Sequence, residues 1–193
     1  MLIMKNMLVI SGASASGKTE VAHVICRKYH LKRVITVTTR EKRPGEIDGV
    51  DYFFVSKEQF KELIENDALV EYTIYNDNYY GSKKDQILDD NILVIEAEGL
   101  KSYIALNNPS IITFALVVDA KTRRDRMNKR GDKKEDIERR IKSDSAVFSK
   151  KNLVGIDYFI NNKCDVEKTA DDIYQKYQKR LNEKKGAVKK LKS

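Results

Sequence analysis

The sequence predicts an α/β fold: a parallel β-sheet core flanked by helices, with a small mixed α/β insertion and a helical lid. An apolar run at residues 7–10, a Gly-rich loop, a helical pattern at 19–29 and a β-branched run at 33–39 form a βαβ unit. Continuous apolar runs at residues 92–97 and 111–118 are typical of strands buried on both faces of a parallel sheet. With 193 residues and only two prolines to mark linkers, insertions into one core fit better than tandem domains.

The loop after the first strand is the most informative stretch of the chain. Residues 12–19, the phosphate loop, match G-x-x-x-x-G-K-[ST], whose small residues let consecutive backbone N–H groups cradle a phosphate at a helix N-terminus. We expect Lys18 to reach the β- and γ-phosphates and the Thr19 hydroxyl to bind Mg²⁺. A flexible turn between strand and helix is the alternative interpretation of so short a motif. The candidate phosphate-binding residues are Gly12, Ala13, Ser14, Ala15, Ser16, Gly17, Lys18 and Thr19.

Residues 36–89 have the mixed pattern of an insertion into the core. Ser56 and Gln59 form a capping box, which predicts a helix start, and the alternation at residues 69–75 predicts a half-buried strand. In order, the expected elements are a charged Pro-Gly loop (residues 40–51), a strand (52–55), a helix (56–66), a strand (69–75) and a short helix after residue 82.

The rest of the chain completes the core and adds a basic helical segment. We expect Asp119 to cap an Arg-rich helix that Gly131 ends, and a second charged helix to follow as far as Phe148. A last core strand at residues 158–161 and a helix at 166–183 close the fold. The predicted division is a core of residues 1–35, 90–120 and 150–183, an insertion of 36–89, a lid of 121–149 and a basic, disordered tail of 184–193.

Two basic clusters dominate the formal charge of +8. Residues 179–193 hold seven Lys and Arg against one acid, and residues 121–142 hold eleven against five. In the first cluster we expect a solvated extension, with nucleic-acid binding as the less favoured alternative. The second cluster lies inside the fold, so its arginines are candidates for binding an anion.

The composition argues against several classes of function. Cys26 and Cys164 are far apart and lack metal-ligand spacing, and the two histidines, His23 and His30, both lie in or just after the first helix. We therefore expect neither a zinc site nor a Cys/His nucleophile. Reduced thiols predict a cytoplasmic protein, and no apolar run approaches membrane-spanning length. We expect a soluble monomer or homodimer that does not bind membranes.

A longer segment carries a resemblance to a known family. Residues 38–55 match the pattern T-T-R-x-x-R-x-G-E-x-x-G-x-D-Y-x-F-V at every fixed position. Further matches are Tyr-Tyr-Gly-Ser at 79–82, Arg126 to Gly131, Arg139-Arg140, and 157–161. Over roughly residues 8–175 the chain resembles a guanylate kinase. The resemblance implies a phosphate-loop fold that binds ATP at residues 12–19, and Mg²⁺-dependent transfer of the ATP γ-phosphate to GMP or dGMP, giving ADP and GDP in purine nucleotide metabolism.

The arginines suit such a reaction. Phosphoryl transfer to an acceptor that is already an anionic phosphate depends on positioning and charge neutralisation. Arg40 and Arg43, with the hydroxyls of Tyr52 and Tyr80, can form a fork for the acceptor monophosphate. A solvated charged loop is the alternative interpretation of residues 40–51.

Arginines of the second basic cluster can act on the transferring phosphoryl group if the lid closes. Arg126 and Arg140 are preferred over Arg130 and Arg139, and an exposed charged face on a helix pair is the alternative. The expected catalytic residues are Lys18, Arg40, Arg126 and Arg140.

Base selection is expected to follow from hydrogen-bond polarity. Guanine presents N1–H and N2–H₂ donors beside an O6 acceptor, so a carboxylate and a hydroxyl select it over adenine. By resemblance, Glu71 is that carboxylate, Thr36 and Ser82 are the hydroxyls, and Glu96 is a second acidic contact. Without the resemblance, the alternative is that Glu71 is only the polar face of an alternating strand.

Two sites depart from the family pattern. Thr36 stands where the family usually has Ser, which keeps the hydroxyl but crowds the pocket. The family's D-x-D-x-Q-G corresponds to residues 94–99, with Val94 and Glu96 at the acidic positions and Glu98 in place of the amide. Added negative charge near the metal would tighten Mg²⁺ or repel phosphate.

Two other functions fit parts of the pattern. A related kinase for a different nucleotide or sugar-phosphate acceptor would keep the donor half. A guanylate-kinase-like binding module, weak or inactive in catalysis, would keep the acceptor half. The intact phosphate loop and the lid arginines argue against the module.

Overall fold

Five parallel strands form the main sheet, in the order β2–β7–β1–β8–β9. The computed structural model describes residues 6–75, 77–148, 151–162 and 165–190. The strands of this sheet are β1 (Met7–Gly12), β2 (Lys32–Arg33), β7 (Asn91–Ile95), β8 (Ile111–Val117) and β9 (Tyr158–Asn161).

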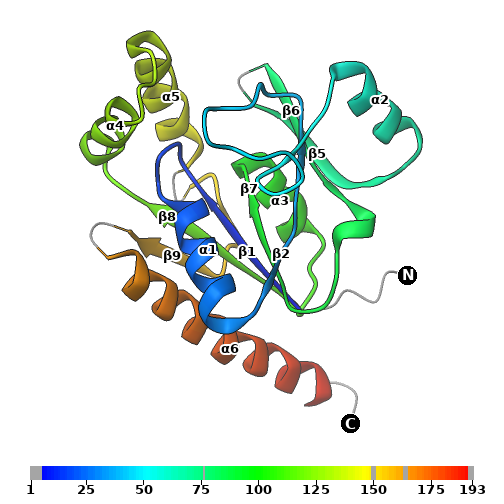
Figure 1. Ribbon diagram of the computed structural model, residues 1–193. Helices are drawn as coiled ribbons and strands as arrows, with labels where there is room; N and C mark the ends of the chain where they lie inside the picture. Colours follow the sequence, from blue (N-terminus) through cyan, green and yellow to red (C-terminus); the bar gives the residue numbers. More distant parts are fainter. Residues whose placement is uncertain (1–5, 76, 149–150, 163–164, 191–193) are drawn as a thin grey trace.

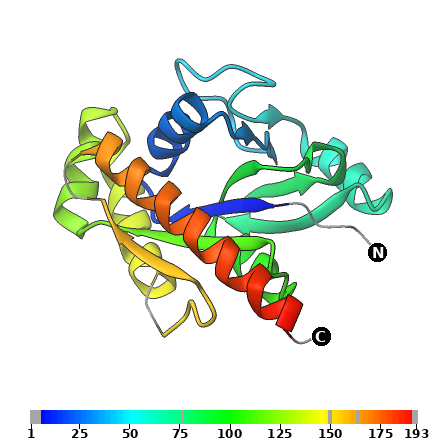
Figure 2. The ribbon, with the colours of Figure 1, turned by 90° about the horizontal axis from the view of Figure 1, so that it is seen from below.

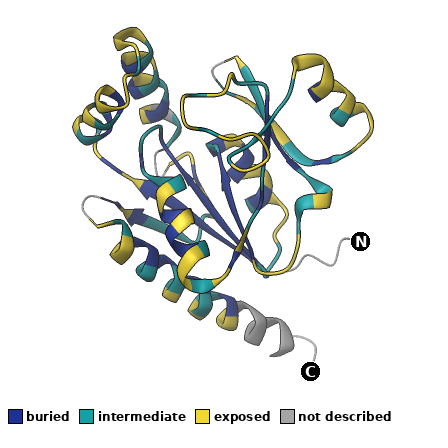
Figure 3. Ribbon diagram, viewed as in Figure 1, coloured by how far each residue is buried: buried dark blue, intermediate teal, exposed yellow. Residues whose placement is uncertain are grey.

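Helices cover both faces of this sheet. Helices α1 (Lys18–Tyr29) and α6 (Val166–Lys190) pack side by side on one face, and α3 (Ala97–Ala105) packs on the other (Figure 1). Figure 2 shows α6 running across the strands. Successive residues of β1 enter opposite cores, Leu8 toward α1 and α6 and Val9 toward α3. The central strands are therefore buried throughout, as the continuous apolar runs predict (Figure 3).

A second, four-stranded sheet in the order β4–β3–β6–β5 forms most of the insertion. Its small core includes Val37, Phe60 and Leu69. The capping box at Ser56 is present, with both of its hydrogen bonds to Gln59. The elements are β3 (Val37–Thr38), β4 (Phe53–Phe54), α2 (Lys57–Glu65), β5 (Leu69–Tyr75), β6 (Asn78–Lys83) and the 3₁₀ turn η1 (Lys84–Gln86).

The helices α4 (Ala120–Lys129) and α5 (Lys134–Val147) follow β8 and pack against each other. Their contact is made by Met127, Ile137 and Ile141. The Asp119 side chain accepts a hydrogen bond from the Thr122 N–H and caps α4, as predicted. This α4–α5 pair stands beyond the carboxyl end of the main sheet (Figure 1).

Several features differ from the sequence prediction. Residues 78–83 form the strand β6, which the sequence analysis does not predict, and the short helix expected after residue 82 is only the 3₁₀ turn η1. The run at residues 33–39 is split between the two sheets: the Val34 N–H still donates to Ile92, whereas the Thr36 carbonyl already accepts from Phe53. Helix α3 was not predicted.

Another difference concerns the tail. Helix α6 continues to Lys190, although a disordered tail was expected from residue 184. The Lys and Ala residues there favour helix once a preceding helix is anchored. Residues 191–193 lie outside the described part of the chain. Among the described residues, no helix is both long and apolar enough to cross a membrane.

Candidate functional site

A basic cleft with a volume of about 480 Å³ lies at the carboxyl end of the main sheet. This is the edge at which parallel α/β sheets bind their ligands. The phosphate loop, the Pro-Gly loop, the second sheet and the α4–α5 pair all contribute to its walls. Its cationic lining residues outnumber the acidic ones, so the cleft favours an anion. The cations are Lys18, Arg33, Arg40, Arg43, Arg126, Arg130, Arg139 and Arg140, and the acids are Glu20, Glu46, Asp51 and Glu96.

Glycines give the phosphate loop its shape. Gly17 stands at the N-cap of α1 with φ 87°, a left-handed conformation that favours glycine. At Gly12, a Cβ would lie 2.6 Å from the Ser16 Oγ and 3.0 Å from the Leu116 carbonyl oxygen. The turn from strand to helix therefore requires glycine at both motif positions.

Side chains from other elements hold the carbonyl groups of the loop. Asn162 Nδ2 donates to the Ser16 oxygen at 2.7 Å, and Arg126 Nη1 donates to the Ala15 oxygen at 3.1 Å. Arg126 Nη2 also donates to the Asn162 carbonyl at 3.3 Å. These contacts fix the course of the loop backbone. The N–H groups at the start of α1 have no acceptor within the helix and are available to an anion.

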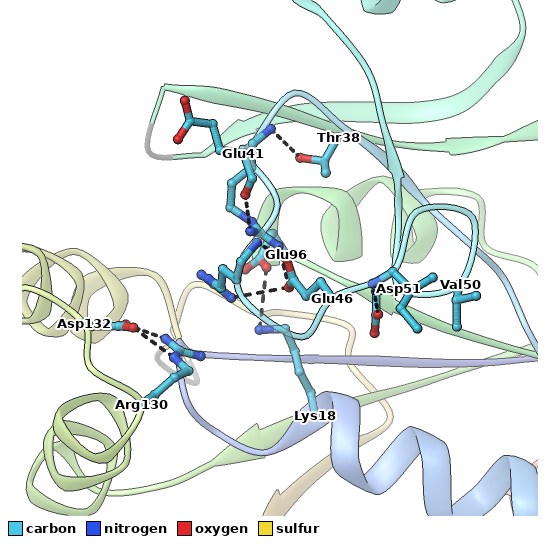
Figure 4. Close-up of polar contacts among 12 residues, drawn as sticks. Lys18, Thr38, Glu41, Glu46, Val50, Asp51, Glu96, Arg130 and Asp132 are labelled. Atoms are coloured by element: carbon cyan, nitrogen blue, oxygen red, sulfur yellow. Dashed lines mark hydrogen bonds and ion pairs between the residues drawn. The ribbon is translucent and has the colours of Figure 1, made fainter.

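Lys18 and Glu96 face each other across the floor of the cleft (Figure 4). Lys18 Nζ donates to the Gly12 carbonyl oxygen at 3.2 Å and lies 3.6 Å from Glu96 Oε1. Both side chains are about one-seventh exposed. Thr19, in the first turn of α1, also lines the cleft. Among the described residues, no group of three or more His, Cys, Asp or Glu side chains could hold a metal ion.

Arg40 and Arg43 are organised by Glu46. Arg40 Nη2 donates to both carboxylate oxygens of Glu46, at 2.7 and 2.9 Å, and the Arg43 backbone N–H donates to Glu46 Oε2 at 2.8 Å. Burial alone would raise the pKa of Glu46, but the hydrogen bonds from Arg40 and from the Arg43 amide outweigh it and lower the pKa. The Arg40 guanidinium also stacks over the ring of Tyr52, 5.4 Å from its centre.

The Pro-Gly loop of the insertion and the α4–α5 pair bring their positive charges together in the cleft. Burial, and then the charges of Arg40, Arg130 and Arg140, lower the pKa of Arg43. Burial, followed by the charge of Glu96, raises the pKa of Tyr52 and of Tyr80, which remain neutral hydroxyl donors near neutral pH.

A small pocket of about 10 Å³ opens beside the cleft and shares Tyr52, Tyr80 and Glu96 with it. Its other lining residues include Thr36, Glu71 and Gly99. This volume is about the size of one water molecule, so a base enters only if the walls move apart.

Glu71 is the buried carboxylate of the small pocket. Its Oε1 accepts from the Ser82 hydroxyl at 2.6 Å, and its Oε2 would lie 2.8 Å from a Cβ at Gly99. Burial raises the pKa of Glu71, opposed in part by the hydrogen bonds from Ser82. The carboxylate thus reaches the first turn of α3, where only glycine leaves room for it.

The arginines predicted in the lid separate into three kinds. Arg130 and Arg140 converge on Asp132: Arg130 Nε and Arg140 Nη1 each lie 3.0 Å from a carboxylate oxygen (Figure 4 shows the Arg130 contact). Arg139 is half exposed and pairs with Asp136 in its own helix. Arg126 lines the cleft, and its guanidinium donates to the phosphate loop backbone.

The charge at Glu98 lies outside the cleft. The side chain is exposed in the first turn of α3 and pairs with Lys101 at 2.7 Å. The departures from the family pattern predicted that Glu98 would add negative charge near the metal. This prediction is wrong, because the Glu98 carboxylate lies outside the cleft.

Several residues of the site carried no role in the sequence analysis. Glu46 was visible as a fixed position of the 38–55 pattern, but its task of orienting Arg40 was not. Asp132 lies close in sequence to its partners Arg130 and Arg140, but one acid in a segment of many charges gives no distinct signal. For Asn162, Tyr75, Asp144 and Arg123 no local signal exists, because their partners are distant in sequence.

The fold and the cleft define a phosphate-loop α/β protein whose basic cleft is shared between the loop, an inserted sheet and a helix pair. The chain belongs to the guanylate kinase family, whose pattern matches residues 4–183. It is 35% identical over 176 residues to a guanylate kinase of Clostridioides difficile (strain 630), covering 86% of this chain and 84% of that one. A guanylate kinase of Mycoplasmoides gallisepticum is 34% identical, covering 88% and 90%. The crystal structure of guanylate kinase from Anaplasma phagocytophilum superposes with a TM-score of 0.68 at 26% identity, covering 92% and 87%.

Proposed function

We propose that this protein is a guanylate kinase that transfers the γ-phosphate of ATP to GMP or dGMP, giving ADP and GDP. The observation that carries the proposal is a single cleft with a phosphate loop at one end and, at the other, an arginine fork beside a buried carboxylate. Relatives of that name over most of the chain support it. No observation favours a sugar-phosphate acceptor or an inactive binding module.

At the donor end, residues 12–19 bind the ATP phosphates. The N–H groups at the start of α1 donate to phosphate oxygens, and Lys18 exchanges its contacts with Gly12 and Glu96 for the β- and γ-phosphates. Arg126, with Asn162, keeps the loop in shape by holding its carbonyls.

At the acceptor end, Arg40 and Arg43 bind the GMP phosphate together with the hydroxyls of Tyr52 and Tyr80. Glu46 holds Arg40 so that little side-chain entropy is lost on binding.

In the small pocket, the Glu71 carboxylate accepts from guanine N1–H and N2–H₂, while Ser82 and Thr36 supply hydroxyls for O6. Glu96 lies at the mouth of this pocket, between the base and the phosphates. GMP binding opens the pocket and displaces the Glu71–Ser82 hydrogen bond in part.

Mg²⁺ fits the donor set at the cleft floor. In phosphoryl-transfer sites this ion keeps several waters and binds through one or two protein oxygens plus substrate phosphates. The Thr19 hydroxyl, with the Glu96 carboxylate nearby, would supply the protein oxygens. The ion would neutralise charge on the β- and γ-phosphates.

Each part of the fold is given one role. We assign acceptor binding to the insertion, residues 36–89, and lid closure to residues 121–149, with the core and the basic tail as divided from the sequence. The cytoplasmic location and the monomeric or homodimeric state stay predictions.

A coupled assay of ADP release tests the function directly. With ATP and Mg²⁺, we expect GMP and dGMP to support turnover and AMP, CMP and UMP to support little, because only guanine matches the polarity of Glu71 and its neighbouring hydroxyls. No GMP-dependent turnover, or a preference for AMP, would show that the proposal is wrong.

Replacing Arg140 with Ala is expected to lower kcat by about 10²-fold, because a cation aimed at the transferring phosphoryl group stabilises the transition state. Arg139→Ala is the matched control: the adjacent arginine pairs with Asp136 in its own helix, and its loss should leave kcat nearly unchanged. Equal effects of the two substitutions in steady-state kinetics would contradict the preference for Arg140.

A further inference from the structure

A buried polar junction lies behind the phosphate loop, where the core, the insertion and the α4–α5 pair meet. At its centre is Asp144 of α5, whose side chain is 1% exposed. Its Oδ2 accepts from the Ser14 backbone N–H at 2.8 Å and from Arg123 Nη1 of α4 at 2.8 Å. A buried carboxylate is stable only when it is paired and hydrogen-bonded, and Asp144 meets both conditions.

Tyr75, the last residue of β5, joins the insertion to this junction. Its hydroxyl donates to Asp144 Oδ1 at 2.7 Å and lies 3.1 Å from the Ser14 Oγ. Burial, and then the Asp144 charge, raise the pKa of Tyr75, so the phenol remains a donor near neutral pH. Its ring meets the ring of Tyr80 edge-on, with centroids 6.5 Å apart, and Tyr80 belongs to the acceptor fork.

Apolar packing does not fill the space on this side of the loop. A cavity of about 220 Å³ borders Ala13, and Arg123 and Asp144 are among its walls. The remaining walls include Leu116 and Val118 at the end of β8, and Phe148. On this side of the loop, a hydrogen bond from the Ser14 N–H to Asp144 ties the loop backbone to α5.

We propose that Tyr75 and Asp144 are positioning residues that hold the Ser14 end of the phosphate loop at a fixed distance from the acceptor insertion. The inference rests on the proposed function. In this arrangement Arg123 pairs with the Asp144 carboxylate and orients it, Asp144 fixes the loop, and the Tyr75 hydroxyl ties β5 to both. The two substrates are then held with their reacting oxygens aligned, an effect that appears in the rate of transfer more than in the affinity for either substrate.

Tyr75→Phe tests the positioning role of Tyr75 by removing only its hydroxyl oxygen. It keeps the ring and leaves the Asp144–Arg123 pair intact. We expect the single-turnover rate of phosphoryl transfer from ATP to GMP to fall at least about tenfold, toward the 10²-fold that a misplacement of about 1 Å costs. The dissociation constants of ATP and GMP should change little, and so should the Tm.

Tyr72→Phe is the matched control. Tyr72 lies on the same strand with a half-exposed side chain, so loss of its hydroxyl should leave the rate unchanged. A Tyr75→Phe enzyme as fast as the wild type would overturn the inference, as would a rate loss fully explained by weaker binding or a lower Tm. A wild type without GMP kinase activity would instead refute the proposed function.

A double-mutant cycle with Asp144→Asn asks whether the pair acts as a unit. We expect the double variant to be little slower than the slower single variant, because either change breaks the same connection. Fully additive losses would overturn the pairing. Asn keeps the shape of Asp but leaves Arg123 without its counter-charge. If this variant does not fold, the Tyr75→Phe result alone decides whether the inference holds.

Discussion

Replacing Lys18 with Ala is expected to lower kcat by about 10³-fold or more while GMP binding stays measurable. Lys18 is the cation of the phosphate loop itself, 3.2 Å from the Gly12 oxygen and 3.6 Å from Glu96. Its charge would meet the β- and γ-phosphates as negative charge builds on the donor. The arginine fork for GMP stands on a different element and keeps its own support from Glu46. Stopped assays for ADP, with GMP titrated separately by calorimetry, measure the two effects.

The substitution also removes the partner of Glu96, so controls must separate charge from contact. Lys101→Ala removes an exposed lysine that pairs with Glu98 away from the cleft, and turnover should not change. Lys18→Ala combined with Glu96→Gln restores the local charge balance, and we expect no recovery of kcat. Unchanged turnover in Lys18→Ala, or full recovery in the double variant, would be inconsistent with a phosphate-binding role for Lys18.

Replacing Glu71 with Gln is expected to lower kcat/KM for GMP by up to about 10⁴-fold, the penalty for a buried polar mismatch. Glu71 is the carboxylate within the small pocket, and an amide offers one acceptor and one donor where guanine presents donors only. The Arg40 and Arg43 fork is untouched, so residual GMP binding should come from the phosphate alone. Steady-state kinetics with GMP measure the loss, and Glu62→Gln, an exposed site on α2, is the control.

The same variant is expected to alter stability in a pH-dependent way. Because burial raises the pKa of Glu71 in the folded state, the protonated carboxyl contributes stability that is fully present below its unfolded pKa and is lost as pH rises through its folded pKa. Gln stays neutral throughout. The free energy of unfolding in urea, measured without nucleotide, should therefore rise in Glu71→Gln relative to the wild type, and this gain should be larger at neutral pH than in acid. A stability difference independent of pH would contradict the raised pKa.

Local patterns were enough to predict the core. The Gly12 to Thr19 motif, the apolar runs of β7 and β8, the Ser56 capping box and the Asp119 cap all act through neighbours in sequence, and all are present. The split between β2 and β3 could not be seen, because the β-branched run continues through residues 33–39 while the tertiary partners change at residue 34.

In the candidate site, too, local patterns predicted some features and tertiary contacts determined the others. Motif spacing placed Arg40, Arg43, Tyr52, Tyr80 and Lys18 among the residues of one cleft, and the structure brings them together. It could not show that Arg126 holds the loop backbone or that Glu98 points to Lys101. Nor could it show that Tyr75 meets Asp144, since the two are 69 positions apart and come together only in the folded chain, beside Ser14 of the phosphate loop.

The ratio of kcat/KM for GMP to that for AMP, measured side by side in the wild type and in Glu71→Gln, shows whether one cleft joins an ATP phosphate loop to a guanine-selective acceptor pocket. We expect the wild type to prefer GMP by about 10⁴-fold and Glu71→Gln to lose most of that preference through its loss of GMP turnover. A wild type that uses AMP as well as GMP, or a preference that survives in Glu71→Gln, would contradict this arrangement.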